Sequence, residues 1–309
     1  MRSPSIVVIG SSNTDLIIRV PRIPRAGETL LGGEFMTAAG GKGANQAVGA
    51  ARSGGNVAFI ARVGTDAFGD AALAGLQRDG IDLSCVRRDR RAASGAALIF
   101  VARNGENSIA VAGGANAKLS PADVKRAAGI IRSAALLVAQ LETPLATVMA
   151  AAVVAVKAGV PVVLNPAPAR PLPDRLLELI SVLTPNQTEA ELLTGIRVTD
   201  DAAAARACST LRARGVRTVI LTLGSRGAYV ADASGQQRVP GFKVKARDTT
   251  AAGDIFNGAL AVALTERKTV RDAVRFANAA AALSVTRLGA QPSAPTRAEI
   301  DKFLERGGK

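Results

Sequence analysis

Short apolar runs alternate with segments of helical periodicity along most of the chain. The strands expected at residues 57–62 and 218–223 have continuously apolar centres, at 57–61 and 219–221, which is typical of buried strands. Strands that alternate with helices predict an α/β fold, with a mainly parallel central sheet flanked by helices on both faces. Further strands are expected at 5–10, 136–141, 160–164, 181–184, 229–231 and 238–239. Helices are expected after the glycine-rich stretch 39–46 to about residue 52, at 68–79, from Ser120-Pro121, from Pro144, at 252–266, from 270 to about 286, and at 297–304.

Two strand pairs fall outside this alternation. Residues 16–20 and 30–37 flank a turn rich in Pro and Gly, and residues 96–102 and 108–112 flank Asn104-Gly105, a strong hairpin signal. We expect these four strands to form one small sheet that lies over the main sheet as a lid. The prediction is a single α/β domain over residues 1–309, with the lid inserted from about 13–38 and 95–113.

The composition supports a large domain with an aliphatic core. The chain has 309 residues, and 48% of them are hydrophobic, which is ample for a sizeable core. Only 3% are aromatic and Trp is absent, so Ala, Val, Leu and Ile must fill this core. No N-terminal signal segment is visible, and no apolar run is long enough to span a bilayer.

The absence of His excludes imidazole triads and His metal ligands. Any proton transfer must therefore fall to Asp, Glu, Lys or Tyr. The two cysteines, Cys85 and Cys208, are far apart and in no metal-like spacing, which indicates a reducing cytosol. We therefore expect a cytoplasmic protein that has no membrane partner.

The net charge of +14 suits an anionic partner, either nucleic acid or a phosphorylated metabolite. The densest basic cluster, residues 87–91, has no interleaved aromatic residue and no recognisable binding motif. It is interpreted as a solvated basic loop, with a non-catalytic regulator that binds nucleotide or nucleic acid as a remote alternative. A nicotinamide-dependent dehydrogenase is excluded because no glycine fingerprint follows the first strand.

Polar side chains follow several of the predicted strands. Asn13 and Asp15 come after the first strand, Glu142 follows residues 136–141, and Asn186 follows residues 181–184. Strand ends of a parallel sheet meet in one crevice, where ligands bind. Each of these residues also has a structural alternative, as a turn former or a helix cap.

Two glycine-rich stretches lead into helices. Residues 39–46 match neither a Walker P-loop nor a dinucleotide fingerprint, and a tight strand-to-helix turn is an equal alternative. In residues 248–257, Gly253 leaves backbone N–H groups uncovered at the positive pole of a helix, and Asp254 lies at that pole. Asp254 is either a helix cap or a base that takes a proton from a substrate hydroxyl.

These two stretches resemble the paired signatures of the PfkB carbohydrate kinases. The first is Gly40-Gly41-Lys42-Gly43-Ala44-Asn45-Gln46, and the second is Asp248-Thr249-Thr250-Ala251-Ala252-Gly253-Asp254. The resemblance covers nearly the whole chain and implies a Rossmann-type α/β sandwich with a small β-sheet lid. This chain departs from the family pattern at two positions. It has Ala251 where the family usually has Gly, and Asn278 where members of the family can have His. The other matching stretches are 13–15, 165–169, 184–189, 222–227 and 289–293.

The resemblance implies phosphorylation of D-ribose at O5 by ATP. Asp254 would be the base, and backbone N–H groups of Ala252, Gly253 and Asp254 would form an anion hole for the γ-phosphate. Carboxylate, amide and ammonium groups would bind the sugar hydroxyls. The sugar set is Asn13, Asp15, Gly41, Lys42, Gly43, Asn45, Glu142 and Asp254; the nucleotide set is Asn186, Thr222, Gly224, Ser225, Gly227, Gly253 and Asn278.

The resemblance also implies two cations and a homodimer that forms through the lid. Asn186 and Glu189 would hold Mg²⁺ through water, because this ion keeps several of its waters. 2-Deoxyribose, fructose, ketodeoxygluconate or a nucleoside are alternative substrates in the same family. Glu142 as a cap, Asn186 as a turn residue and Lys42 as a surface charge remain open. The K⁺ site would be built by Asp248, Thr250, Ser284, Arg287, Gly289 and Ser293.

Overall fold

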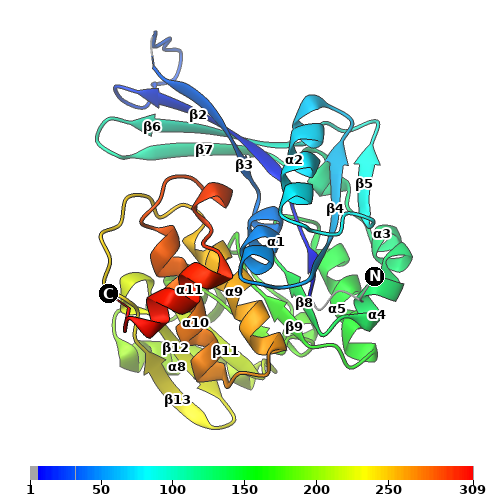
Figure 1. Cartoon of the computed structure of the whole chain (residues 1–309), viewed down its shortest axis with the longest axis vertical. Helices are drawn as coiled ribbons and strands as arrows, with labels where there is room; N and C mark the ends of the chain where they lie inside the picture. The colour runs from blue at the N-terminus through cyan, green and yellow to red at the C-terminus, as the bar shows by residue number, and fades with distance from the viewer. Residues whose placement is uncertain (1–5, 32, 309) are drawn as a thin grey trace.

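A nine-stranded sheet forms the centre of the computed structural model, which describes residues 6–31 and 33–308 (Figure 1). Its order is β13-β12-β11-β10-β9-β8-β1-β4-β5, and all pairs are parallel except β11–β12 and β12–β13 at one edge. The predicted mainly parallel sheet is confirmed. Its strands are β1 (Ile6–Ile9), β4 (Val57–Gly64), β5 (Val86–Asp89), β8 (Leu136–Ala139), β9 (Val162–Leu164), β10 (Val182–Leu183), β11 (Thr218–Thr222), β12 (Ala228–Asp232) and β13 (Gly235–Val239).

Helices cover both faces of this sheet, because successive side chains of its buried strands point to opposite sides. In β1, Ile6 and Val8 belong to one core cluster, and Val7 and Ile9 belong to the other. The cluster with Ile6 and Val8 contains residues of α1 (Lys42–Arg52), α2 (Ala67–Arg78), α9 (Ala252–Thr265), α10 (Val270–Ser284) and α11 (Arg297–Glu305). The cluster with Val7 and Ile9 contains residues of α3 (Pro121–Arg126), α4 (Ala128–Ser133), α5 (Leu145–Lys157), α6 (Asp174–Leu177), α7 (Gln187–Thr194) and α8 (Asp201–Ala213).

A second sheet of four strands stands at one end of the molecule, in the order β3-β2-β6-β7 (Figure 1). The prediction that the two strand pairs join into one small sheet is confirmed, although β2 already begins at Asn13. The expected strand at 30–37 is shifted, since β3 begins only at Phe35 and continues to Gly40; Gly32 lies outside the described residues. The strands are β2 (Asn13–Val20), β3 (Phe35–Gly40), β6 (Gly95–Ala102) and β7 (Asn107–Ala112).

The basic cluster at residues 87–91 is not simply a solvated loop, and that interpretation was wrong for its first half. Residues 86–89 form β5, which pairs in parallel with the end of β4. The buried Asp89 forms an ion pair with Arg62 at 2.8 Å, and the guanidinium of Arg88 pairs with Asp70 at 2.7 Å. Residues 87–89 of the cluster therefore stabilise the edge of the sheet, through the pairing of β5 with β4 and through these two ion pairs.

Helices α1 and α9 pack with their backbones in close approach. A Cβ added to Gly258 would lie 2.5 Å from the backbone nitrogen of Ala50 and 2.6 Å from the carbonyl oxygen of Gln46. No side chain fits there, and this contact places the start of α1 beside the start of α9. Within the described residues, no helix is both long and apolar enough to cross a membrane.

Candidate active site

Asp254 lies in the first turn of α9 and does not cap that helix. The N-cap position is Ala251, which makes no side-chain cap. The carboxylate of Asp254, only 5% exposed, instead accepts hydrogen bonds from two side chains of α1. Oδ1 accepts from Nε2 of Gln46 at 3.0 Å, and Oδ2 accepts from Nδ2 of Asn45 at 3.1 Å. The interpretation of Asp254 as a cap is therefore wrong.

The surroundings of Asp254 act on its pKa in both directions. Burial raises this pKa, while the positive charge of Lys42 and the hydrogen bonds from Gln46 and Asn45 lower it; the net shift is upward. In return, the charge of Asp254 raises the pKa of the Lys42 ammonium. A carboxylate that is poorly hydrated and has a raised pKa is a better proton acceptor than one in water. Lys42 is not merely a surface charge.

A cleft of about 380 Å³ opens beside the start of α9. It is bordered by Ala252 and Gly253, and a Cβ added at Gly253 would meet nothing within 4 Å. The N–H of Ala252 donates to the carbonyl of Thr249 at 3.3 Å, so one of the three predicted anion-hole groups has an internal partner in this conformation. The cleft also contains the predicted nucleotide residues Thr222, Gly224, Ser225, Gly227 and Asn278.

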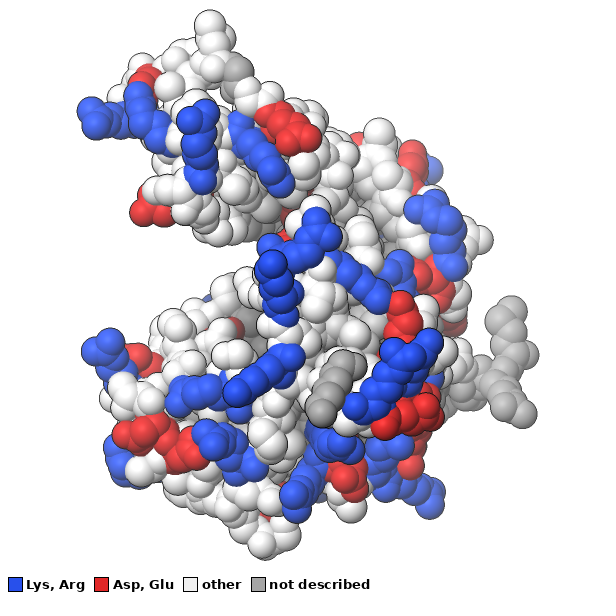
Figure 2. Space-filling view, turned by 60° about the vertical axis from the view of Figure 1, so that its left-hand side comes forward, with Lys and Arg blue, Asp and Glu red and all other residues white. Residues whose placement is uncertain are grey.

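The wall of this cleft suits a flat, apolar base with a charged tail. Phe242, Val244, Phe256 and Val285 supply apolar surface. The Nδ2 of Asn278 is used structurally, since it donates to the carbonyl of Pro240 at 3.2 Å. In space-filling view the molecule is hollowed between its two lobes, and Lys and Arg lie along much of the rim (Figure 2). Such a rim attracts a polyanionic ligand.

Several of the predicted sugar residues lie close to Asp254. Burial, together with the nearby negative charges of Glu142 and Asp254, raises the pKa of Asp15 to about 6. The buried Oδ1 of Asn45 has no hydrogen-bond partner among the described residues, so it is available to a hydroxyl donor. Nδ2 of Asn116 donates to Oδ1 of Asn13 at 2.7 Å, and this bond fixes the orientation of the Asn13 amide.

Glu142 does cap a helix, but not the one that follows it in sequence. Its Oε2 accepts from the backbone N–H of Lys42 at 2.9 Å and from the hydroxyl of Ser11 at 2.5 Å. Glu142 therefore closes the start of α1, together with Ser11, whose Oγ accepts from the N–H of Gly43 at 3.3 Å. The turn needs glycine: Gly41 has φ +88°, and a Cβ at Gly43 would lie 2.5 Å from the Ser11 nitrogen.

The two residues predicted for Mg²⁺ form a reciprocal capping box at the start of α7. Oδ1 of Asn186 accepts from the N–H of Glu189 at 2.8 Å, and Oε2 of Glu189 accepts from the N–H of Asn186 at 2.8 Å. Asn186 is therefore more than the turn residue that the sequence left as an alternative, because it caps α7. Each of these oxygens keeps a further lone pair for a water molecule. Among residues 6–31 and 33–308, no group of three or more acidic or Cys side chains could hold a metal ion directly.

The predicted K⁺ residues lie on two loops that Asp248 joins. Its Oδ1 accepts from the N–H of Thr250 at 2.9 Å, and its Oδ2 accepts from the N–H of Gly289 at 2.8 Å. The hydroxyls of the buried Ser284 and Ser293 donate to carbonyls of their own turns at 2.9 and 2.7 Å, respectively. The side chain of Arg287 pairs with Glu299, so only its backbone is free to face a cation.

Several buried polar residues that bond to the predicted site residues or to one another received no role from the sequence. They are Gln46, Asn116, Gln140, Asn165 and Asn257, and each is less than 9% exposed. Gln46 and Asn165 lie inside matching motifs, so their position was a usable signal. Gln140 and Asn257 carried none, because their partners come from distant parts of the chain.

Comparison with known proteins places the chain in a well-populated family. The model of the pfkB family carbohydrate kinases matches residues 3–297. A ribokinase from Haemophilus influenzae is 48% identical over 301 residues, covering 97% of this chain and 98% of that protein. A deoxyribokinase from Salmonella typhimurium is 39% identical over 97% of this chain and 98% of that protein. The structure of Arabidopsis thaliana ribokinase complexed with ribose and ATP has a TM-score of 0.92 at 36% identity, covering 98% of this chain and 99% of that chain.

Proposed function

The chain belongs to the pfkB family of carbohydrate kinases, and we propose that it transfers the γ-phosphate of ATP to O5 of D-ribose, giving D-ribose 5-phosphate and ADP. The observation that carries this proposal is the position of Asp254. Its buried carboxylate accepts a hydrogen bond from Asn45 and raises the pKa of Asp15, and both residues are expected to bind the sugar. Asp254 directly follows Ala252 and Gly253, which border the cleft that contains the expected nucleotide residues. The similarity to the ribokinases of Haemophilus influenzae and Arabidopsis thaliana, which extends over nearly the full chain, supports ribose as the substrate.

In the proposed reaction, Asp254 takes the proton of the 5-hydroxyl as that oxygen bonds to the γ-phosphorus. The bond from this phosphorus to the β-phosphate oxygen breaks, and ADP leaves. N–H groups of Ala252, Gly253 and Asp254 stabilise the charge on the transferred phosphoryl group, once the Ala252 N–H is released from Thr249. The ammonium of Lys42 lies within electrostatic reach of Asp254 and Glu142 and balances the negative charge of the site.

Two cations complete the proposal. Mg²⁺ would arrive with ATP and be held through water by Asn186 and Glu189, where it supplies charge neutralisation. K⁺ would lie by the backbone of the two loops that Asp248 joins, and it would stabilise the anion-hole turn without touching the sugar.

The activity is tested with purified protein, ATP, Mg²⁺ and ribose, in KCl and in matched NaCl. Phosphorus and carbon NMR of the product should locate the phosphate on O5, and turnover should be faster in KCl. Absence of any ATP-dependent product in either salt would refute the proposed reaction. Equal rates in the two salts would contradict only the proposed K⁺ site and would leave the proposed reaction standing.

Ribose binding should weaken in acid. Asp15 has a pKa of about 6 in the free protein, so its carboxylate accepts hydroxyl hydrogen bonds above that pH and loses this ability as the pH falls below it. We expect the KM for ribose to rise from pH 7 to pH 5. The variant Asp15→Asn should have a higher KM that changes little over this range. A wild-type KM that stays flat to pH 5 would contradict the assignment of Asp15.

We also propose a homodimer that forms through the outer face of the small sheet. Asp15 pairs with Ala97, so these residues face the sugar site, and the next residue, Leu98, points to the opposite face. Leu98 is 52% exposed and Phe35 is 63% exposed on that outer face. An apolar face of this kind needs cover in water, and a second copy of the lid matches it in shape and chemistry.

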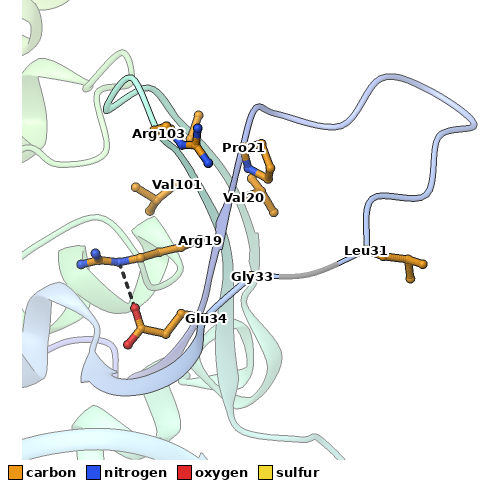
Figure 3. A pocket seen from close by; sticks show the side chains of 9 residues that line it. Arg19, Val20, Pro21, Leu31, Gly33, Glu34, Val101 and Arg103 are labelled. Carbon is orange, nitrogen blue, oxygen red and sulfur yellow. Dashed lines mark ion pairs between the residues drawn. The ribbon is translucent and has the colours of Figure 1, made fainter.

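The far end of the small sheet adds a recess of about 590 Å³ (Figure 3). It is lined by the ends of β2 and β6 and by residues of the segment that precedes β3, and none of the residues expected at the sugar or nucleotide borders it. Arg19 and Glu34 form an ion pair at 3.8 Å in its wall, and Leu31 stands exposed at its margin. The recess therefore extends the surface available to a partner lid.

The dimer is tested by the variant Leu98→Lys. We expect it to sediment with the mass of one chain, while the wild type sediments with twice that mass. Leu192→Lys is the matched control, because Leu192 is 46% exposed on α7, outside the small sheet. A wild type that sediments as a monomer at micromolar concentration would contradict the proposed homodimer.

We also propose that the protein is cytoplasmic. Its two free cysteines support this location, and cell fractionation tests it.

A further inference from the structure

A chain of buried amide side chains lies directly behind Asp254. Gln46 is 0% exposed, and its Nε2 donates both to Oδ1 of Asp254 at 3.0 Å and to Oδ1 of Asn165 at 3.1 Å. Its neighbour Asn45 keeps a free acceptor for a ligand, but Gln46 has none that faces the cleft. Gln46 can therefore influence the reaction only through the groups it holds.

The orientation of this amide chain is set by a backbone carbonyl. Nδ2 of Asn165 donates to the carbonyl of Thr184 at 3.1 Å, and a carbonyl can only accept. The Oδ1 of Asn165 must then face Gln46, so Gln46 must present its NH₂ group to Asn165 and to Asp254. The Oε1 of Gln46 is left to accept from Nε2 of Gln140, at 2.7 Å. Neither rotation of the Gln46 amide nor an alternative donor is compatible with these partners.

The same strand end holds the first turn of α9 by a second route. The hydroxyl of Thr184 donates to Oδ1 of Asn257 at 2.6 Å, and Nδ2 of Asn257 donates to the carbonyl of Gly253 at 2.8 Å. The base and the anion-hole turn are thus tied to one point at the end of β10. Gln46, Asn165, Thr184 and Asn257 are each more than nine-tenths buried, so water competes little for the bonds between their side chains.

We propose that Gln46 is a positioning residue, which holds the Asp254 carboxylate in the orientation from which it removes the proton of the acceptor hydroxyl. The inference rests on the proposed kinase reaction. Each Asp254 oxygen has one amide donor, and the two donors fix the plane of the carboxylate. One lone pair on the oxygen that faces the sugar is then aimed at the hydroxyl, without any rearrangement during the reaction.

The test is Gln46→Met, which keeps the length of the side chain and removes the donor. We expect kcat to fall about 10- to 100-fold, with the KM for ATP changed by less than about threefold. The acid limb of the kcat–pH profile should move to higher pH, because the lost hydrogen bond favoured the ionised form of Asp254. Gln140→Met makes the same chemical change one hydrogen bond further away, so its loss should be several times smaller and its pH profile that of the wild type.

Equal losses and equal pH profiles for the two Met variants would overturn the proposal, because the effect would then come from packing alone. If Gln46→Met does not unfold cooperatively, Gln46→Glu replaces it, since Glu has the shape of Gln. In this variant, carboxylate oxygens of the new side chain would face the oxygens of Asp254 and Asn165, which can no longer receive a hydrogen bond from it. We therefore expect kcat near neutral pH to fall by more than about 100-fold. A wild-type kcat in Gln46→Glu would also overturn the proposal. Failure of the kinase reaction itself would appear in the wild type, so the two failures are separable.

Discussion

The variant Asp254→Asn should lose ribose phosphorylation almost completely while it continues to bind ribose and ATP. Asn has the shape of Asp but cannot take up the proton of the 5-hydroxyl, and loss of a general base costs about 10³-fold in kcat. The site can accept the new amide. The Oδ1 of Asn45 has no partner among the described residues, so this amide can turn and accept from the new NH₂ group, while the NH₂ of Gln46 still meets the remaining oxygen. The NH₂ of Asn45 then faces the sugar, where a hydroxyl oxygen can accept from it.

The measurement is kcat by ADP release, with ligand affinities from titration calorimetry. The dissociation constants for ribose and ATP should stay within about threefold of the wild type, as expected when an interaction serves the transition state alone. A variant that keeps a tenth or more of the wild-type kcat would show that Asp254 is not the base. A variant with lost binding would assign Asp254 to substrate affinity instead.

The second large effect is expected for Gly258→Ala. The new methyl group would stand 2.5 Å from the Ala50 nitrogen and 2.6 Å from the Gln46 oxygen, both of which are backbone atoms that cannot rotate away. Helices α1 and α9 must separate, at a cost of about 2–3 kcal/mol in the free energy of unfolding. Since Asp254 lies one turn before Gly258, it also moves away from Asn45 and Gln46, and kcat should fall by about tenfold or more.

Gly129→Ala is the matched control for this variant. Gly129 is an exposed residue of α4, and a Cβ there would meet nothing within 4 Å. The same substitution should raise the free energy of unfolding by about 0.4–1 kcal/mol, because Ala leaves the unfolded chain less conformational freedom than Gly does. Chemical denaturation of both variants measures the contrast. If Gly258→Ala proved as stable as the wild type, the close approach of α1 and α9 would not be what holds the site together.

The sequence was sufficient for the fold where the physical signal is local. Buried parallel strands such as β4 and β11 are continuous apolar runs, and the hairpin of β6 and β7 carries Asn104-Gly105 in its turn. It was not sufficient for β5, whose Arg-rich sequence looks like a solvated loop until Arg62 and Asp70 are seen to pair with it. Helices α7 and α8 were also not predicted individually, since their Ala, Glu and Arg residues give a weak apolar stripe.

The same division applies to the site. Asp254, Lys42 and Asn45 could be predicted because each lies in a short motif with its own chemistry. The partner of Glu142 could not, because the N–H of Lys42 lies 100 positions away in the chain. Nor could the amide chain behind Asp254, where bonds such as Gln46 to Asn165 depend on three strand ends meeting at one place. Long-range polar contacts leave no periodic trace in a sequence, so only the structure shows them.

One competition assay tests the central claim most directly. Equal concentrations of D-ribose and 2-deoxy-D-ribose are incubated with the wild-type protein, limiting ATP, Mg²⁺ and KCl, and the products are separated and identified by mass. The account predicts ribose 5-phosphate as the main product, with no product from Asp254→Asn under the same conditions. Preferential formation of the deoxyribose phosphate, or formation of ribose 5-phosphate by Asp254→Asn at the wild-type rate, would contradict it.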